Sequence, residues 1–205
     1  GKTTLLNLLG GLEKQSSGII LYENNPYEKN WYGKIIPKDD LFYVGDLRKQ
    51  SPKKTVSAYI ADKFGKKKKV IANRYFNDGS FKNLLHRTIK NISDAEANWL
   101  SMVLAIEADP RVLLIDDYGT YFNSKMEKEF RTKIIKMNRN LGTTIILTAP
   151  SDIYIKYFAS VLIFLDHGHI WKIRSGSARP ANKNRVNTKK RGNSKGHNRR
   201  NRRAK

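Results

Sequence analysis

The chain begins with GKTTLLNLLGGL, residues 1–12, and the later motifs can be placed relative to this segment. Its first residues match the end of the phosphate-binding pattern G-x-x-x-x-G-K-[ST], and the leucines that follow predict a buried helix. A helix that starts this way presents free backbone amides and the positive end of its dipole to an anion. Lys2 adds a positive charge, and Thr3 offers a hydroxyl to Mg²⁺. We therefore expect Gly1, Lys2, Thr3 and Thr4 to bind a polyphosphate.

The chain starts at the second glycine of that pattern and has no initiator methionine. We therefore expect a fragment that lacks an N-terminal strand and the first half of the loop. A chance Gly-Lys-Thr triplet beside a core helix is the alternative, and the triplet alone does not exclude it.

Composition narrows the class of protein. The 205 residues are enough for one domain with a sizeable core and a tail. The absence of cysteine excludes disulfides and thiolate metal sites and favours a cytosolic setting. Four scattered histidines do not predict a metal site, and the longest apolar run, residues 159–165, is too short to span a bilayer.

The formal charge of +22 is unevenly distributed along the chain. Residues 174–205 contain 13 Lys or Arg residues, no acidic residue and one large apolar residue, Val186. Such a segment cannot bury enough surface to fold alone, so we expect a globular domain over residues 1–173 and a disordered basic tail over residues 174–205. The run Lys66–Lys69 is expected to be a solvated surface, with contact to phosphate or lipid as the alternative.

The second half of the chain alternates between strand-like and helix-like patterns. Ser93 and Glu96 form a capping box that starts a helix ending near Asp109, and the fully apolar run Val112–Ile115 predicts a central parallel strand. Alternation of this kind predicts an α/β sheet. The expected strands are 19–22, 41–44, 112–115, 143–148, 160–165 and 169–173, and the expected helices after the first are 55–64, 81–89, 93–109, 125–139 and 152–158.

Two carboxylates, Asp116 and Asp117, follow the apolar run directly. Ligands of open α/β sheets lie outside the carboxyl ends of the strands, so we expect these carboxylates to meet the Lys2 loop there. One such Asp suits Mg²⁺ held through water, and the next suits the polarisation of an attacking water. We predict Thr3 and Asp116 as Mg²⁺ ligands and Asp117 as a catalytic residue.

In order and register, these motifs resemble those of the ATP-binding subunit of an ABC transporter over residues 1–173. The sequence GKTTLL (1–6) is similar to the end of the Walker A motif, and SGII (17–20) to the strand after the first helix. ISDAE (92–96) occupies the place of the L-S-G-G-Q signature and runs without a gap into DPRVLLID (109–116), which is similar to the Walker B segment. The sequences TTIILT (143–148), ASVLIFL (159–165) and GHI (168–170) resemble the strand before the switch histidine and the closing strands.

The resemblance implies a P-loop NTPase fold of the RecA-like type, with a parallel sheet core and a small helical subdomain. It also implies ATP and Mg²⁺ as cofactors. The implied partners are a membrane permease and a second ATP-binding subunit, in a homodimer or heterodimer. The implied location is the cytoplasm, peripherally at the inner face of the cell membrane. The signature-like position falls on Ser93, Asp94, Ala95 and Glu96.

The sequence departs from the family pattern at positions that act on the nucleotide. These residues are Asp46 at the Q-loop glutamine, with Gln50 as the alternative, Asp94 and Ala95 at the signature glycines, Asp117 at the catalytic glutamate, Asn123 at the D-loop aspartate and Ala149 at the switch histidine. Ala149 cannot donate a hydrogen bond to a γ-phosphate, and the carboxylate of Asp94 would repel one. We therefore expect the fold to be retained with ATP hydrolysis weakened or lost. A divergent but working ATPase is the alternative.

The resulting hypothesis is an ATP-binding subunit of an ABC transporter that binds Mg-ATP and couples it to a membrane permease. An ABC-related protein that acts on RNA, ribosomes or DNA without a permease is the second hypothesis, motivated by the basic tail. A fragment without present activity is the third. The tail itself is expected to bind anionic lipid or RNA. The sequence does not identify the transported substrate, the direction of transport or the partner subunit.

Overall fold

The computed structural model describes residues 1–45, 47–77 and 79–177. The α-helices are α1 (Lys2–Leu9), α2 (Leu47–Gln50), α3 (Val56–Phe64), α4 (Lys68–Tyr75), α5 (Asp94–Ala108) and α6 (Ser124–Lys136). The other helical segments are the 3-10 helices η1 (Gly65–Lys67), η2 (Gly79–His86) and η3 (Ile89–Asn91) and the π-helix η4 (Met137–Leu141). The strands are β1 (Leu21–Tyr22), β2 (Asn25–Pro26), β3 (Leu41–Val44), β4 (Val112–Ile115), β5 (Thr144–Leu147), β6 (Val161–Asp166) and β7 (His169–Ser175).

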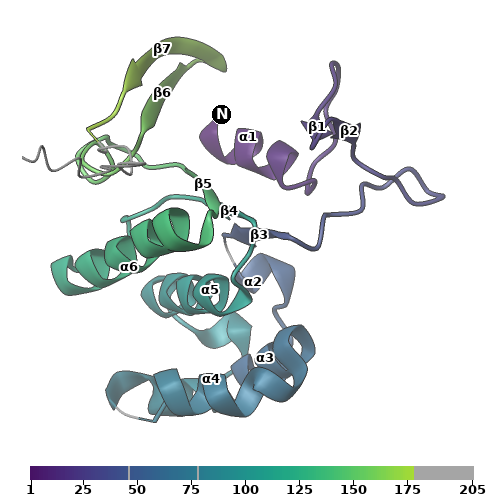
Figure 1. The fold of residues 1–205 in the computed structure, drawn as a ribbon. Coiled ribbons are helices and arrows are strands. Elements are labelled where there is room, and N and C mark those ends of the chain that lie inside the picture. The colour runs from purple at the N-terminus through teal and green to yellow at the C-terminus, as the bar shows by residue number, and fades with distance from the viewer. Residues whose placement is uncertain (46, 78, 178–205) are drawn as a thin grey trace, which may run out of the picture.

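Three parallel strands form the central sheet, in the order β3-β4-β5. Val44 pairs with Ile115, and Ile115 pairs with Leu147, so the carboxyl ends of all three strands lie at one edge. Two antiparallel pairs, β1–β2 and β6–β7, lie outside this sheet. Helix α1 covers one side of the central strands, and α5 and α6 cover the other (Figure 1). The predicted α/β architecture and the central position of Val112–Ile115 are confirmed.

Strand β4 is apolar because both of its faces are covered. Leu114 points toward α1, where a Cβ added to Gly10 would lie 3.5 Å from Leu114 Cδ1. Leu113 and Ile115 point the other way, into the main core, and all three side chains are at most 1% exposed. Alternate side chains of a strand point to opposite faces, so a strand between two helix layers needs apolar residues at every position.

The predicted small helical subdomain is present and packs around one tryptophan of α5. Trp99 stacks on Phe81 of η2 with ring centroids 3.8 Å apart and meets the edge of Phe76 at 5.4 Å. Helices α3 and α4 lie on this side of α5, at the end of the molecule away from α1 (Figure 1). Helix α5 therefore holds the helical subdomain with one face and the sheet with the other.

The predicted helix over residues 81–89 is wrong. The structure has two 3-10 helices there, η2 and η3, separated by an extended Thr88. The backbone on either side of Thr88 forms hydrogen bonds with the segment that starts α3. Val56 N donates to the Arg87 carbonyl, and Ile89 N donates to the Lys54 carbonyl. These bonds to the start of α3 interrupt any regular helix.

The predicted helix over residues 152–158 is also wrong, because this segment forms successive turns. Backbone bonds from Lys156 N to the Asp152 carbonyl and from Ala159 N to the Ile155 carbonyl close two turns without a regular helix. The segment is rich in aromatic and β-branched residues, which have low helix propensity.

The predicted strand over residues 19–22 is shorter, and it forms a hairpin. Only Leu21–Tyr22 is paired, with Asn25–Pro26, and the turn residues Glu23 and Asn24 both have positive φ angles, 51° and 64°. A two-residue turn with positive φ at both positions matches the twist of the strands that it joins.

Strand β7 runs to Ser175, two residues past the predicted domain boundary. Arg174 pairs with Asp152 and lies 4.9 Å from the Phe164 ring, so it belongs to the folded part. The rest of the predicted tail, residues 178–205, lies outside the described residues.

No helix in the described ranges has both the length and the apolar character that crossing a membrane requires.

Candidate functional site

Asp116 is the centre of the candidate site. It follows β4 directly, and its Oδ1 accepts a hydrogen bond from Thr3 Oγ1 of α1 at 3.3 Å. The two residues are 113 positions apart in the sequence, and the bond joins the carboxyl end of the central strand to the first turn of α1. The predicted meeting of the Gly-Lys-Thr segment with Asp116 is therefore present in the geometry.

Thr148 also contacts Asp116. From the sequence it was predicted only as the end of a strand, without a role in the site. Its hydroxyl donates to Asp116 Oδ1 at 2.7 Å and accepts from Asp117 N at 3.0 Å. Its backbone carbonyl accepts from Tyr118 N at 2.8 Å. Thr148 thus fixes three successive residues after β4. Its place directly after β5 is a usable signal, because the carboxyl ends of neighbouring parallel strands meet at one edge.

Tyr43 of β3 is the second residue that the sequence reasoning missed. Its hydroxyl lies 3.5 Å from Asp116 Oδ2, in donating geometry. Burial raises the pKa of the Tyr43 hydroxyl well above its usual range, and the charge of Asp116 and this hydrogen bond raise it further. Tyr43 therefore stays neutral at ordinary pH and acts only as a hydrogen-bond donor to the carboxylate.

The residues predicted to bind phosphate lie at the open start of α1. Gly1, Lys2, Thr3 and Thr4 are all exposed, and Gly1 precedes the helix as its N-cap. The Gly1 carbonyl accepts from Leu5 N at 2.9 Å, which is the first bond of the helix. The amides of residues 2–4 precede that bond and have no partner within the helix. They are available to an anion beside Asp116.

Asp117 is exposed and follows Asp116 in a left-handed conformation, with φ 50°. An aspartate tolerates this conformation better than most residues do. Its backbone is fixed by Thr148, while its carboxylate is accessible to solvent. Ala149 lies next to Thr148 and is half-buried, so the predicted switch position is at the same edge but carries no polar side chain.

The signature-like residues Ser93, Asp94, Ala95 and Glu96 lie at the start of α5. Ser93 and Glu96 form the predicted capping box: Ser93 N donates to Glu96 Oε2 at 2.7 Å, and Glu96 N donates to Ser93 Oγ at 3.3 Å. Partial burial of Glu96 acts to raise its pKa, but hydrogen bonds from Ser93 and the charge of Arg87 outweigh this effect and hold the pKa below its usual value.

The negative charge of Asp94 has a basic partner. It forms an ion pair with Arg48 of α2 at 2.5 Å. The interactions of the signature-like residues therefore stay within α2, α5 and the segment before α5, and the contacts described for Asp116 do not include them. The repulsion expected from Asp94 is reduced by Arg48.

Asn123, at the predicted D-loop position, caps α6, where its Oδ1 accepts from Met126 N at 2.9 Å. Its side chain thus has a structural task at a helix start. Asp46, at the predicted Q-loop position, lies outside the described residues, as does the side chain of the alternative Gln50.

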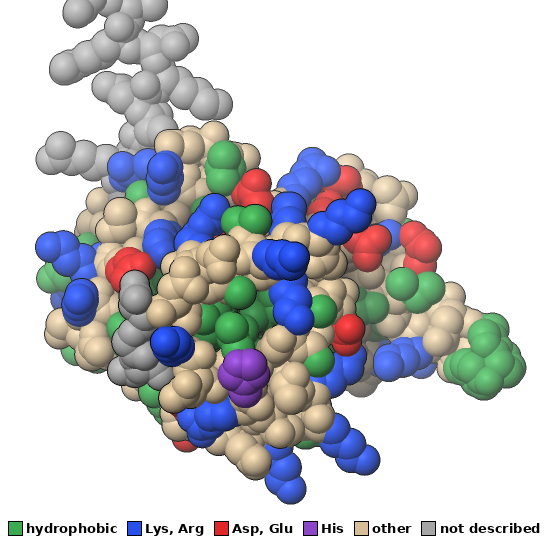
Figure 2. Space-filling model, turned by 90° about the horizontal axis from the view of Figure 1, so that it is seen from below, with side chains coloured by type: hydrophobic (Ala, Val, Ile, Leu, Met, Phe, Trp, Pro, Cys, Tyr) green, Lys and Arg blue, Asp and Glu red, His purple; other side chains and the backbone are tan. Residues whose placement is uncertain are grey.

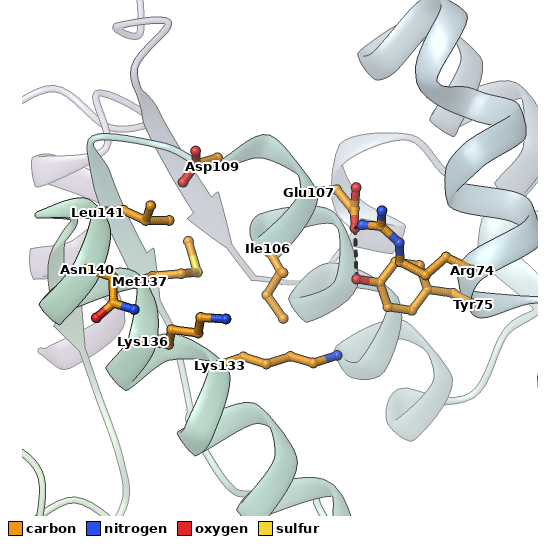
Figure 3. Close-up of a pocket in the computed structure, with 10 residues that line it drawn as sticks. All are labelled: Arg74, Tyr75, Ile106, Glu107, Asp109, Lys133, Lys136, Met137, Asn140 and Leu141. Carbon is orange, nitrogen blue, oxygen red and sulfur yellow. Dashed lines mark hydrogen bonds and ion pairs between the residues drawn. The ribbon is translucent and has the colours of Figure 1, made fainter.

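A cavity of about 420 Å³ lies between α4, α5, α6 and η4 (Figure 3). In its wall Glu107 accepts hydrogen bonds from the Tyr75 hydroxyl at 2.8 Å and from Arg74. Burial, followed by the bond and charge of Glu107, raises the pKa of Tyr75 to about 12. The cavity also includes Asp109, which lies before the amino end of β4, whereas Asp116 lies after its carboxyl end. It is therefore separate from the Asp116 site.

The chemistry of the Asp116 site fits Mg²⁺ bound together with a polyphosphate. The described residues hold no group of three or more Asp, Glu or His side chains suited to a metal ion on its own. Mg²⁺ commonly takes one or two protein oxygens and completes its shell with water and phosphate oxygens. The adjacent Thr3 hydroxyl and Asp116 carboxylate match that requirement.

Comparison with protein families decides the relationship. The model for the family described as "ABC transporter" matches residues 1–118, which is more than half of the chain and includes α1, β3, α5, β4 and Asp116. The chain belongs to the ABC transporter family. The matched range contains both Thr3 and Asp116, which the structure brings into contact.

Curated relatives are ATP-binding proteins of import systems. The sn-glycerol-3-phosphate import ATP-binding protein UgpC of Chromobacterium violaceum is 27% identical over 180 residues, which cover 84% of this chain and 47% of the relative. The spermidine/putrescine import ATP-binding protein PotA of Clostridium novyi is 24% identical over 181 residues, covering 83% and 50%. The chain thus spans about half the length of the curated relatives it matches.

Solved structures agree on the fold. The dimeric ATP-binding cassette MJ0796 bound to ADP and Pi superimposes with a TM-score of 0.67 at 16% identity, covering 85% of this chain and 80% of that one. Protein cbiO1 from Clostridium perfringens, described as part of the ABC transporter complex cbiONQ, gives 0.61 at 18% identity, covering 87% and 73%. The P-loop fold expected from the resemblance is confirmed.

The Thr148 hydroxyl should stabilise the folded chain. Thr148→Val removes the donor to Asp116 and leaves Asp117 N without an acceptor, so we expect the free energy of unfolding to fall by about 1–2 kcal/mol. Urea unfolding followed by circular dichroism measures this, and Thr148→Ser, which keeps the hydroxyl, should lose less. A Val variant as stable as the wild type would show that the hydroxyl does not hold the strand ends.

Proposed function

We propose that this chain is the ATP-binding subunit of an ABC transporter, which binds Mg-ATP and couples it to a membrane permease. The observation that carries the proposal is the hydrogen bond from Thr3 to Asp116 in a chain of this family. It brings a phosphate-binding helix start and a carboxylate together at the edge of a parallel sheet, where such folds bind their ligands. The relatives with matching sequences are import ATP-binding proteins by name.

Each residue of the site has a distinct task in this proposal. The amides of Lys2, Thr3 and Thr4 and the Lys2 ammonium bind the phosphates. The Thr3 hydroxyl and the Asp116 carboxylate hold Mg²⁺, which neutralises charge on the β- and γ-phosphates. Thr148 and Tyr43 keep the Asp116 carboxylate oriented through the hydrogen bonds at 2.7 Å and 3.5 Å. Orientation matters because Mg²⁺ demands near-octahedral geometry.

Hydrolysis is the weaker part of the activity. In this proposal Asp117 polarises an attacking water beyond Asp116, and the exposure of its carboxylate supports that role. Ala149, however, offers no hydrogen bond to the γ-phosphate as negative charge develops on it, and such donors account for much of the rate of phosphoryl transfer. The site therefore favours binding and slow turnover.

Two protein partners are part of this proposal. The family suggests them both, and the start of α5 is the segment that would contact the second ATP-binding subunit. We propose a permease subunit and a second ATP-binding subunit, with the protein held at the cytoplasmic face of the membrane through the permease. In the second subunit's site, the start of α5 would face the γ-phosphate. The ion pair between Arg48 and Asp94 lowers the repulsion there and leaves a composite site feasible.

Binding should depend on Lys2 whether or not Mg²⁺ is present. Lys2→Ala should bind ATP at least about tenfold more weakly than the wild type, because a charge-assisted contact to phosphate is lost. Lys14→Ala, at another exposed lysine, is the matched control and should bind normally. Thr3→Ala should weaken binding with Mg²⁺ but not with EDTA, measured by isothermal titration. Equal affinity of Lys2→Ala and wild type would rule the site out.

Turnover should be low and should respond to two substitutions in opposite directions. We expect phosphate release well below about 1 s⁻¹, the lower end of the usual enzyme range. Asp117→Asn should abolish the remaining activity, and Ala149→His should increase it by supplying the missing donor. A wild-type rate of about 1 s⁻¹ or more that Asp117→Asn abolishes would show that Ala149 does not limit the reaction.

A further inference from the structure

The helical subdomain carries nearly the whole net charge of the folded body, to which Arg174 of β7 adds one positive charge. Residues 1–50 and 91–173 together contain 16 basic and 16 acidic residues, so they are electrically neutral. Residues 51–90, which form α3, η1, α4, η2 and η3, contain 11 basic residues and two acidic ones. This 40-residue segment is therefore strongly positive beside a neutral remainder.

Few of these charges are paired. Lys54 pairs with Asp62 of the same segment, while Arg74 and Arg87 pair with Glu107 and Glu96 of α5. Within the described ranges, the remaining cations make no ion pair with an Asp or Glu side chain; they are Lys53, Lys63, Lys66, Lys67, Lys68, Lys69, Lys82 and Lys90. Lys63 Nζ lies 5.8 Å from the centre of the Phe42 ring and Lys68 is half-buried, whereas the other six lysines are exposed to solvent.

The densest part of this charge is Lys66–Lys69, where η1 passes into α4. Gly65 has φ 50° and ends α3, and four lysines follow it without a break. Lys68 and Lys69 occupy the first turn of α4, which contains no acidic residue. Cations at a helix start oppose the helix dipole, and neighbouring like charges repel. The run therefore costs stability in the isolated protein, and an anionic surface would reverse that cost.

Val70 follows the run directly, and 53% of its surface is exposed. We call the segment Lys66–Val70, in which every side chain except the half-buried Lys68 is exposed, the lysine face. Figure 2 looks onto the end of the molecule where α3 and α4 lie in Figure 1, and Lys and Arg side chains project over this end. The lysine face thus combines solvated ammonium groups with one accessible apolar side chain.

We propose that the lysine face binds the headgroups of an anionic phospholipid membrane. Basic clusters near such a surface gain binding energy from each Lys or Arg that reaches it, and Val70 can enter the headgroup region beside them. Single-stranded RNA is less suited, since it is held by stacking on aromatic side chains, and the described part of residues 51–90 has no strongly exposed aromatic ring. The contact adds to docking on a permease and uses none of the residues of the Asp116 site.

The chain has no cysteine, so a single introduced thiol reports on one position. Val70→Cys would be labelled with an environment-sensitive dye and mixed with vesicles of phosphatidylcholine alone or with about 30% phosphatidylserine. Ile153→Cys, at a side chain 62% exposed between β5 and β6, is the matched control. We expect a blue shift for the label at residue 70 with the acidic vesicles only, and none for the label at residue 153.

The basic segment 174–205 is present in every sample, so a second comparison separates its contribution. One variant replaces Lys66, Lys67, Lys68 and Lys69 with Gln, and its control replaces Lys125, Lys128, Lys136 and Arg139, four exposed cations of α6 and η4, with Gln. Both lose the same charge, and Gln is a good helix former. The first should lower the partition coefficient onto acidic vesicles about a hundredfold or more, and the second much less.

Equal losses in the two variants, or a residue-70 label that does not respond to acidic vesicles, would overturn the proposal. A homopolymeric RNA is the remaining arm of the experiment. If the label at residue 70 responded to the RNA but not to the vesicles, the lysine face would be an RNA contact and the lipid assignment would be wrong.

Discussion

Strand β4 is buried on both faces, and this burial determines where α1, α5 and α6 pack. Leu114 requires α1 on one side, and Leu113 and Ile115 require α5 and α6 on the other. Once α1 is packed there, its first turn lies at the edge where β4 ends. The 3.3 Å bond from Thr3 to Asp116 is then a consequence of core packing, and the polar site needs no separate means of assembly.

The sequence predicted best where a strong local pattern had only one structural solution. The apolar run Val112–Ile115, the capping box from Ser93 to Glu96 and the meeting of Thr3 with Asp116 all follow from local chemistry and from the geometry of parallel sheets. The segments over residues 81–89 and 152–158 were wrong because their backbone bonds are made with other parts of the chain or close isolated turns. The spacing of apolar residues does not show whether backbone groups will bond within a helix or with other segments.

The contacts that were hardest to predict are those that depend on which strands pair and in what register. Thr148 and Tyr43 both reach Asp116, but only the pairing of β3, β4 and β5 brings them there. The same is true of Arg48, which neutralises Asp94 from a different helix. A substitution that looks damaging in the sequence, a carboxylate in place of a glycine, is thus partly compensated by a residue 46 positions away. The effect of such a substitution on nucleotide binding is therefore smaller than the single position suggests, because a neighbouring residue can compensate for it.

Charged side chains have different surroundings in two parts of the chain. At the Asp116 site, one carboxylate is held by neutral donors so that it can face a cation. In the helical subdomain, many lysines have no carboxylate partner among the described residues and create a field that extends about a Debye length into solvent. The first arrangement suits a small, geometrically demanding ligand, and the second suits an extended anionic surface without fixed geometry.

The central claim is that Mg-ATP binds where α1 begins and β4 ends. The most direct measurement is the broadening of threonine methyl NMR signals by Mn²⁺-ATP, since Mn²⁺ replaces Mg²⁺ and broadens only nearby nuclei. We expect strong broadening for Thr3 and Thr148 and little for Thr55 and Thr88, which pair with each other in the helical subdomain. Uniform broadening of all four, or broadening that spares Thr3 and Thr148, would contradict it.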